Sequence, residues 1–331
     1  MSPVNNVTFS KNYVTFFELK IIIFMSTKLQ NRIMRNSTLN NPVTGLTARR
    51  LLKKYILVFS LALFCVWLSA NAPLASKQQI SMFKNSKTCV VFEDGISFYN
   101  GCIKDAVQKY WKYTDYEFID QKEFEKRRTD SKYTFIVLAD GAYDKDPGGI
   151  SYSYINLVLG DASGNLTRMP EYCSIPISYS GDKTTDYDYV IPAIVKFMQI
   201  HIKNLEKDRF SISLNGLKYY NKTGFKDKDL LLNRDKIASN ADSPEKIKTA
   251  YPYVVKMIST GEIEKAIATG QASALFHFHV GPPKDAGAGK CFEMIFDIEG
   301  NMYYYNSRKI TNDNPDGFNL KDFNNIRKRN S

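Results

Sequence analysis

Residues 117–138, "EFIDQKEFEKRRTDSKYTFIVL", overlay residues 256–277, "KMISTGEIEKAIATGQASALFH", without a gap at an offset of 139. In this overlay Ile119 corresponds to Ile258 and Glu123 to Glu262, so that "EFEK" meets "EIEK". Repetition in a fixed order is typical of a duplicated structural unit. The overlay therefore predicts that the chain contains one architecture twice. The alternative is two unrelated α/β segments that share a common order of strand and helix.

The flanking sequence continues the same order in both halves. Apolar runs rich in β-branched and aromatic residues predict strands, and apolar residues three and four positions apart predict helices. We predict an α/β fold (α+β with mixed sheets) made of two tandem, similar modules. Each module has the order β-α-β-α-β-β-β-α. The first is expected to comprise residues 76–209 and the second residues 210–331.

The N-terminal region has the features of an export signal. Residues 49–54 are positively charged, an apolar run follows at residues 55–70, and small residues come next, which is typical of a secretory signal peptide. The run is short for a membrane span, which needs about 20 residues. We predict that residues 49–75 are a signal peptide or, if uncleaved, a membrane anchor. Residues 1–48 are expected to lie outside the fold, as an upstream start or a tail.

The charge of the chain is concentrated near its N-terminus. The formal net charge is +11, which by itself would suggest nucleic-acid binding. However, residues 1–75 hold nine Lys/Arg and one Glu, which leaves 36 basic and 33 acidic residues in the rest. We therefore expect no nucleic-acid partner. The expected partner is another envelope protein, with membrane contact only through residues 54–72 if these are retained.

Two of the three histidines lie one residue apart in "ALFHFHV", residues 274–280. Residues i and i+2 of a strand share one face, so His277 and His279 could begin a metal site. No third ligand follows at a defined spacing, so no metal is predicted. The offset of 139 places His277 on the apolar Leu138 and His279 on Asp140, at the polar end of a strand. Functional residues of α/β sheets gather at strand ends. His279 and Asp140 are therefore the first candidates, with His277 next.

Four cysteines follow the apolar run, and an exported chain can form disulfides. Cys89 and Cys102 are the most local pair and a possible disulfide, while four free buried thiols are the alternative. Cys291 is the only candidate for a cysteine nucleophile beside the two histidines. "GAGK" at residues 287–290 fails the spacing of a phosphate-binding loop. No catalytic residue and no cofactor is predicted.

Three stretches resemble an uncharacterised family of exported proteins from Bacteroidetes. They are "KDAVQKYWKYTDYEFIDQKEFEK" (104–126), "YPYVVKMISTGEIEKAI" (251–267) and "CFEMIFDIEGNMYYYNSRKI" (291–310). The order of elements is also similar to the small α/β domains of envelope assembly lipoproteins, such as those of the curli secretion channel family and the penicillin-binding-protein activators. This resemblance implies an exported location and no particular activity.

These observations together predict an exported protein, periplasmic or envelope-associated, of the non-enzymatic class. It would act as a protein-interaction or assembly module, since export and module duplication are accompanied by no catalytic motif. The alternative is an exported hydrolase whose carboxylate or cysteine site is not visible as a motif. Whether the chain is an enzyme is left open, with the non-enzymatic interpretation preferred.

Overall fold

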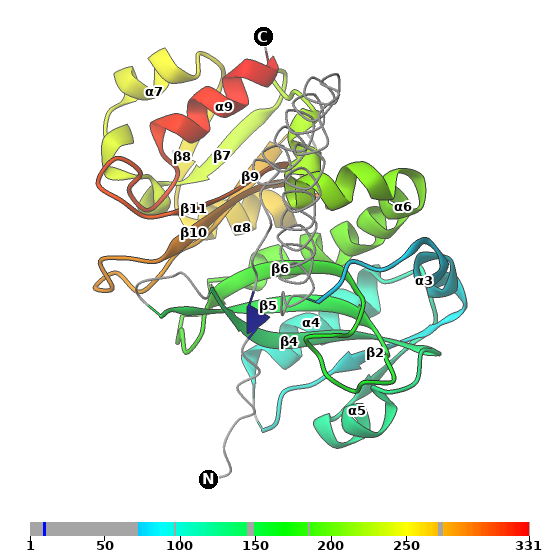
Figure 1. Cartoon of the computed structure of the whole chain (residues 1–331). Coiled ribbons are helices and arrows are strands. Elements are labelled where there is room, and N and C mark those ends of the chain that lie inside the picture. Colours follow the sequence, from blue (N-terminus) through cyan, green and yellow to red (C-terminus); the bar gives the residue numbers. More distant parts are fainter. Residues whose placement is uncertain are drawn as a thin grey trace, which may run out of the picture. The chain divides into compact units, whose positions relative to one another are not determined.

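The computed structural model describes residues 9–10 and 72–330, apart from residues 96, 144–148, 185 and 271–273. Residues 72–330 belong to one compact unit with a mixed α/β fold and two sheets (Figure 1). The predicted leader at residues 49–75 lies outside the described residues except for its last four. None of the described helices is long and apolar enough to cross a membrane.

The first sheet has the strand order β3-β2-β4-β5-β6, and the two-residue β1 pairs with β4. Strand β2 is parallel to both of its neighbours, whereas β4, β5 and β6 are successively antiparallel. The strands are β1 (Phe9–Ser10), β2 (Lys87–Val91), β3 (Tyr116–Ile119), β4 (Tyr133–Ala142), β5 (Ser151–Leu159) and β6 (Glu171–Tyr179). The helices of this half are α3 (Lys77–Met82), η1 (Phe83–Asn85), α4 (Phe98–Tyr110), α5 (Gln121–Arg127), η2 (Asp188–Val190) and α6 (Ile191–Asn215).

The second sheet has the order β8-β7-β9-β10-β11, which is the order of the five longer strands of the first. Strand β7 is parallel to both neighbours, and β9, β10 and β11 are antiparallel. The strands are β7 (Asp229–Asn233), β8 (Val255–Ile258), β9 (Ala274–Val280), β10 (Lys290–Asp297) and β11 (Met302–Lys309). The helices are η3 (Gly216–Lys222), η4 (Arg234–Lys236), η5 (Ser239–Ala241), α7 (Pro244–Ala250), α8 (Thr260–Ala268) and α9 (Leu320–Asn330).

The two halves therefore have the predicted order β-α-β-α-β-β-β-α twice, in mixed sheets. The matching sequence stretches cover β3 with α5 in one half and β8 with α8 in the other. Their shared chemistry is helix capping: the Asp120 carboxylate accepts the Glu123 amide at 2.7 Å, and Ser259 with Glu262 forms a capping box. Such caps satisfy amides that the first helical turn leaves without partners. The predicted module boundary at residues 209/210 falls inside α6, just after Asp208, whose backbone is non-helical.

The strand ladders correct one detail of the overlay. Thr88 of β2 is opposite both Tyr116 and Thr134, and Leu230 of β7 is opposite both Val255 and Leu275. The offset is thus 139 residues between β3 and β8, but 141 between β4 and β9. The reason is that α8 has nine residues where α5 has seven. As a result, His279 corresponds to Leu138, and the predicted equivalence of His279 with Asp140 is wrong.

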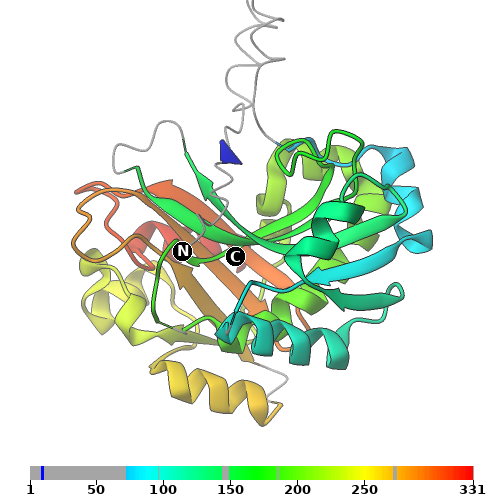
Figure 2. The same cartoon turned by 90° about the horizontal axis from the view of Figure 1, so that it is seen from below.

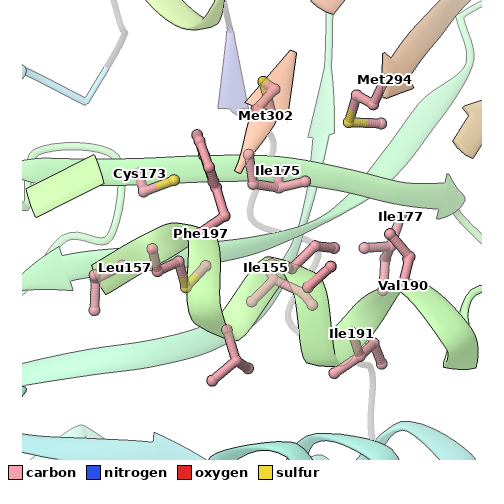
Figure 3. Packing of buried hydrophobic residues seen from close by; sticks show 14 of the residues in the cluster. Ile155, Leu157, Cys173, Ile175, Ile177, Val190, Ile191, Phe197, Met294 and Met302 are labelled. Atoms are coloured by element: carbon pink, nitrogen blue, oxygen red, sulfur yellow. The ribbon is translucent and has the colours of Figure 1, made fainter. Parts of the chain in front are cut away.

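One hydrophobic core extends from the first sheet to the second (Figure 3), and Figure 2 shows the strands of the two sheets. Helix α6 packs against β6, and Phe197 and Ile191 of this helix are fully buried. Figure 3 shows these side chains beside those of β5 and β6, with two methionines of the second sheet nearby. Those labelled from the strands are Ile155, Leu157, Cys173, Ile175, Ile177, Met294 and Met302. Burial of this continuous apolar surface is the main stabilising contribution that joins the modules.

The turn between β10 and β11 packs closely on α6. Gly300 has a φ of +81°, and a Cβ atom there would lie 2.4 Å from the Cβ of Lys196. The Lys196 ammonium in turn donates a hydrogen bond to the Ile298 carbonyl at 2.6 Å. Any other residue would have to adopt an unfavourable positive φ, and its Cβ would clash with Lys196. Glycine is therefore required for this contact.

Candidate functional site: a buried ionic network at the edge of a cleft

Strand β9 has two chemically different faces. Phe276, Phe278 and Val280 belong to the core shared with the first sheet, whereas Leu275 lies in a second core under α7 and α9. Because side chains alternate along a strand, His277 and His279 share the face of Leu275. The His277 ring packs edge-on against Phe318, with 5.0 Å between centroids. The two histidines thus lie between the sheet and the segment before α9.

Glu293 of β10 is at the centre of this face. It lies opposite His279 in the antiparallel ladder, and its carboxylate accepts hydrogen bonds from both imidazoles. The distances are 2.7 Å from Nε2 of His277 and 3.0 Å from Nδ1 of His279. The Glu293 and His277 side chains have no exposed surface. Sequence reasoning missed Glu293, although a single carboxylate in the apolar run "CFEMIF" is a signal that could have found it, because buried charges require partners.

Arg308 of β11 connects Glu293 to the C-terminal helix. One guanidinium nitrogen lies 3.3 Å from the Glu293 carboxylate, and the other lies 3.0 Å from Asp322 of α9. The same guanidinium donates to the carbonyl oxygens of Pro315 and Gly317. Arg308 therefore holds the segment that precedes α9 against the sheet. Guanidinium suits this role because its planar fork presents several donors at once.

Asp322 is the second buried carboxylate of the network. It accepts hydrogen bonds from the Tyr304 hydroxyl at 2.7 Å and from the Asn306 amide at 2.8 Å. It also accepts the backbone amide of Asn319, whose side chain reciprocates at the start of α9. The carboxylate thus caps the helix as well as pairing with Arg308. Burial, followed by the charge of Glu293, raises the pKa of Asp322 above its ordinary value.

The two histidines have opposite protonation preferences. Burial lowers the pKa of His277, which is consistent with a neutral ring that donates from Nε2 to Glu293. Its Nδ1 has no hydrogen-bond partner in the described structure. For His279, burial alone would lower the pKa, but the Glu293 charge and the hydrogen bond to Asp316 raise it to about 9. Burial would likewise raise the pKa of Glu293, yet the charge of His279 and the hydrogen bonds of both histidines hold it well below its usual range.

His279 is also the point at which the network reaches a cavity. Its Nε2 lies 3.3 Å from the carboxylate of Asp316, a side chain that is 43% exposed. Gly281 packs directly on this pair, since a Cβ there would lie 2.7 Å from both Nε2 of His279 and an Asp316 oxygen. His279, Gly281 and Asp316 all line a cavity of about 550 Å³.

Both modules contribute to this cavity. The first module supplies the end of β6 and the connection to α6, and the second supplies the ends of β7 and β9 with the segments that follow. Its ionisable and aromatic lining residues are Asp182, Asp186, Asp235, Asp285, Asp316, Lys236, Lys284, His279, Tyr179, Tyr187, Tyr189 and Phe278. Acidic residues therefore outnumber lysines in a cleft that also presents tyrosine rings.

Asp140 does not join His279 in this site. Its carboxylate accepts a hydrogen bond from the Ser153 hydroxyl at 2.8 Å, across the β4–β5 ladder. It is not among the residues that line the cavity. Within the described ranges, no group of three or more His, Cys, Asp or Glu side chains is arranged to hold a metal ion. Of the predicted candidates, His279 and His277 lie in the network and only His279 reaches the cleft.

Cys89 and Cys102 are free thiols, so the possible disulfide is not formed in the structure. Cys89 packs with Phe124 and Phe135 on the α5 side of the first sheet. Cys102 is on α4, which packs against the opposite face together with Val90. Adjacent residues of a strand point to opposite faces, which explains why the sheet separates the two thiols.

Thiol reactivity offers a direct check of this arrangement. Denatured, unreduced full-length chain should titrate five thiols with Ellman's reagent, one for each cysteine of the sequence. In the native protein Cys102, which is half-buried, should react before Cys89 and Cys291, because both of these are fully buried and burial raises the pKa of both thiols. If only three thiols of the denatured chain react, two of the five cysteines are joined in a disulfide, and the free-thiol arrangement is wrong.

Comparisons of the chain with protein-family models, with curated proteins and with solved structures find no match. The function must therefore be argued from the cleft and its chemistry.

Proposed function

We propose that this chain is an exported, non-catalytic binding protein, and that its cleft receives a basic segment of another envelope protein. The observation that carries the proposal is the cavity of about 550 Å³, to which both modules contribute and which five aspartates line. A cleft of this size fits a few side chains of an extended peptide. Both modules are needed for this cleft, because each of them supplies only part of the residues that line the cavity.

The charge of the cleft differs from that of the rest of the body. Outside residues 1–75 the chain has 36 basic and 33 acidic residues, so an even surface would be slightly positive. Among the described residues, Asp182, Asp186, Asp235 and Asp285 form no ion pair with Lys or Arg. Concentrated unpaired carboxylates attract cations and raise the association rate of a basic partner. Lysine or arginine side chains of the partner would pair with them.

The ionic network supports the cleft by holding its wall in place. Arg308 fixes the backbone at Pro315 and Gly317, and His279 fixes the side chain of Asp316 between them. A wall that is ordered before binding loses less conformational entropy when the partner arrives. In this proposal His279 and Glu293 position the acidic wall and do not contact the partner as reacting groups.

Calorimetric titration with a synthetic peptide tests the proposal. Acetyl-Gly-Lys-Gly-Lys-Gly-amide should bind the full-length chain, and the same peptide with norleucine for lysine should not. Asp186→Asn and Asp235→Asn, one in each module, should each weaken binding about fivefold, or about 1 kcal/mol, at low salt. Higher salt should weaken binding further, because these carboxylates are exposed to screening ions.

Asp227→Asn provides the matched control, since Asp227 is exposed and is not among the lining residues. It should leave the affinity unchanged. The proposal is wrong if the lysine and norleucine peptides bind alike, or if Asp227→Asn weakens binding as much as the two cleft variants.

One observation favours the alternative of an exported hydrolase. Glu293, His279 and Asp316 form a line from the buried network to the cleft, with both imidazole nitrogens paired to carboxylates. However, a ring with a pKa of about 9 is charged at neutral pH and so is a poor general base. The buried Cys291, whose pKa is also raised, is equally unsuited as a nucleophile. Hydrolysis of ester, amide or glycoside substrates that Asp316→Asn abolishes would favour the hydrolase over the binding protein.

A further inference from the structure

The C-terminal part of α6 has an unusual surface. Asp208 interrupts the helix with φ −144° and ψ 54°, and the two residues Phe210 and Leu214 follow with exposed side chains. Phe210 is 73% exposed and Leu214 43%, the former being the most exposed large apolar side chain described. Because they are four residues apart in a helix, the two side chains lie on one face. Large apolar groups that face outward together commonly mark a contact surface.

Basic and aromatic residues precede and follow Phe210 and Leu214 along the chain. Lys203 and Lys207 precede it, and Lys218 and Lys222 follow in η3; all four are exposed. The Lys222 ammonium lies 3.6 Å from the centre of the Tyr219 ring.

The acids of the same stretch already have partners. Glu206 pairs with Lys84 at 3.3 Å, and the Asp208 carboxylate accepts the amide of Ser211. Residues 203–222 hold four lysines and Arg209 against Glu206 and Asp208, so the segment that contains Phe210 and Leu214 carries a net positive charge.

This face lies next to the point where the described body of the chain begins. Arg209 donates hydrogen bonds to the carbonyl of Ala75 at 2.6 Å and to that of Leu74 at 3.2 Å. These are among the first residues described after the apolar run at residues 55–70. Phe210 is thus next in sequence to the residue that holds the start of the body. A chain whose apolar run enters a bilayer would bring this start, and the face beside it, to the lipid surface.

We propose that Phe210 and Leu214, with the lysines at 203, 207, 218 and 222, form a surface that binds an anionic lipid membrane. Apolar side chains inserted at the level of the head groups and lysines directed at lipid phosphates are the combination that surface-bound helices use. Tyr219 belongs to the residue type that is enriched at this interface. This contact is additional to any made by residues 54–72 and is independent of the acidic cleft.

Fluorescence quenching by brominated lipid tests the proposal with the full-length chain. Phe210→Trp and Val254→Trp each place an indole at an exposed apolar position, the latter in the second module before β8. Trp67→Phe in both variants removes the tryptophan of the apolar run, and the buried Trp111 is common to both. Vesicles of phosphatidylglycerol and brominated phosphatidylcholine should quench the indole at 210 roughly twofold and leave that at 254 nearly unchanged.

Two further measurements distinguish this surface from simple tethering. Lys203→Glu with Lys207→Glu should reduce quenching at 210, and vesicles without phosphatidylglycerol should do the same. An unchanged far-ultraviolet circular dichroism spectrum shows that the variants are folded. Equal quenching of the indoles at 210 and 254, or quenching of neither, would show that this surface does not bind the membrane and would overturn the proposal.

Discussion

Replacement of Glu293 by alanine is expected to lower the free energy of unfolding by about 3–5 kcal/mol, the range for removing one partner of a buried ion pair. The carboxylate has no exposed surface and contacts His277, His279 and Arg308. Without it, two cationic side chains would be left beside each other in a nearly dry environment. Chemical denaturation followed by circular dichroism measures the loss.

The matched control is Glu125→Ala on α5. Glu125 is exposed, and its one ion pair among the described residues is with Arg128 at the end of the same helix, so its removal should cost less than about 1 kcal/mol. The double variant Glu293→Ala/His279→Gln should be more stable than the sum of the single changes predicts, since it also removes one unpaired charge. Equal losses for Glu293→Ala and Glu125→Ala would show that the network does not stabilise the fold.

The second large effect is a loss of stability as the pH rises from 6.5 to 9. The pKa of His279 rises from an ordinary value of 6.5 to about 9 in the folded protein, because the attraction of Glu293 and Asp316 exceeds the opposing effect of burial. Below 6.5 the imidazole is charged in both states, and the stabilisation is fully present. Between 6.5 and 9 only the folded protein keeps the proton, so about 3 kcal/mol is lost over this interval. In the His279→Gln variant the free energy of unfolding should not show this decrease between pH 6.5 and 9.

Acid should destabilise the protein through His277 and Glu293. The pKa of His277 is lowered by burial, so its stabilisation declines as the pH falls below 6.5, where the unfolded chain binds the proton and the folded one does not. The pKa of Glu293 is also lowered, and its contribution is lost below the ordinary value of 4.5. The network should therefore be most stabilising near pH 6.5. A midpoint of urea denaturation that rises steadily from pH 6.5 to 9 would contradict this assignment.

Much of the fold could be predicted because it rests on local rules. Asp120 and Ser259 cap helices that follow short strands, and apolar runs such as residues 133–138 and 274–278 mark central strands. These signals depend on neighbours in sequence, so they are readable without tertiary information. The same rules could not show which residues of β4 and β9 are equivalent. Helix α8 is two residues longer than α5, and this difference leaves the order of apolar and polar residues almost unchanged.

The candidate site was predicted only in part. His279 was identified by its place near a strand end, and it does line the cleft. Asp140, which was predicted to be the equivalent position in the first module, is not equivalent, because α8 is two residues longer than α5. Its carboxylate accepts a hydrogen bond from Ser153 of the neighbouring strand. Glu293, Arg308 and Asp322 lie on three separate elements, and no spacing along the chain connects them.

The sequence by itself determined the duplicated order of strands and helices, because alternation, helical periodicity and capping are written within a few adjacent residues. The tertiary structure decided which charges meet. Glu293 is opposite His279 only through the β9–β10 ladder, and Arg308 reaches Asp322 only where α9 covers β11. The physical reason is that burial sets the strength of a charge's interactions, and burial depends on how distant elements pack.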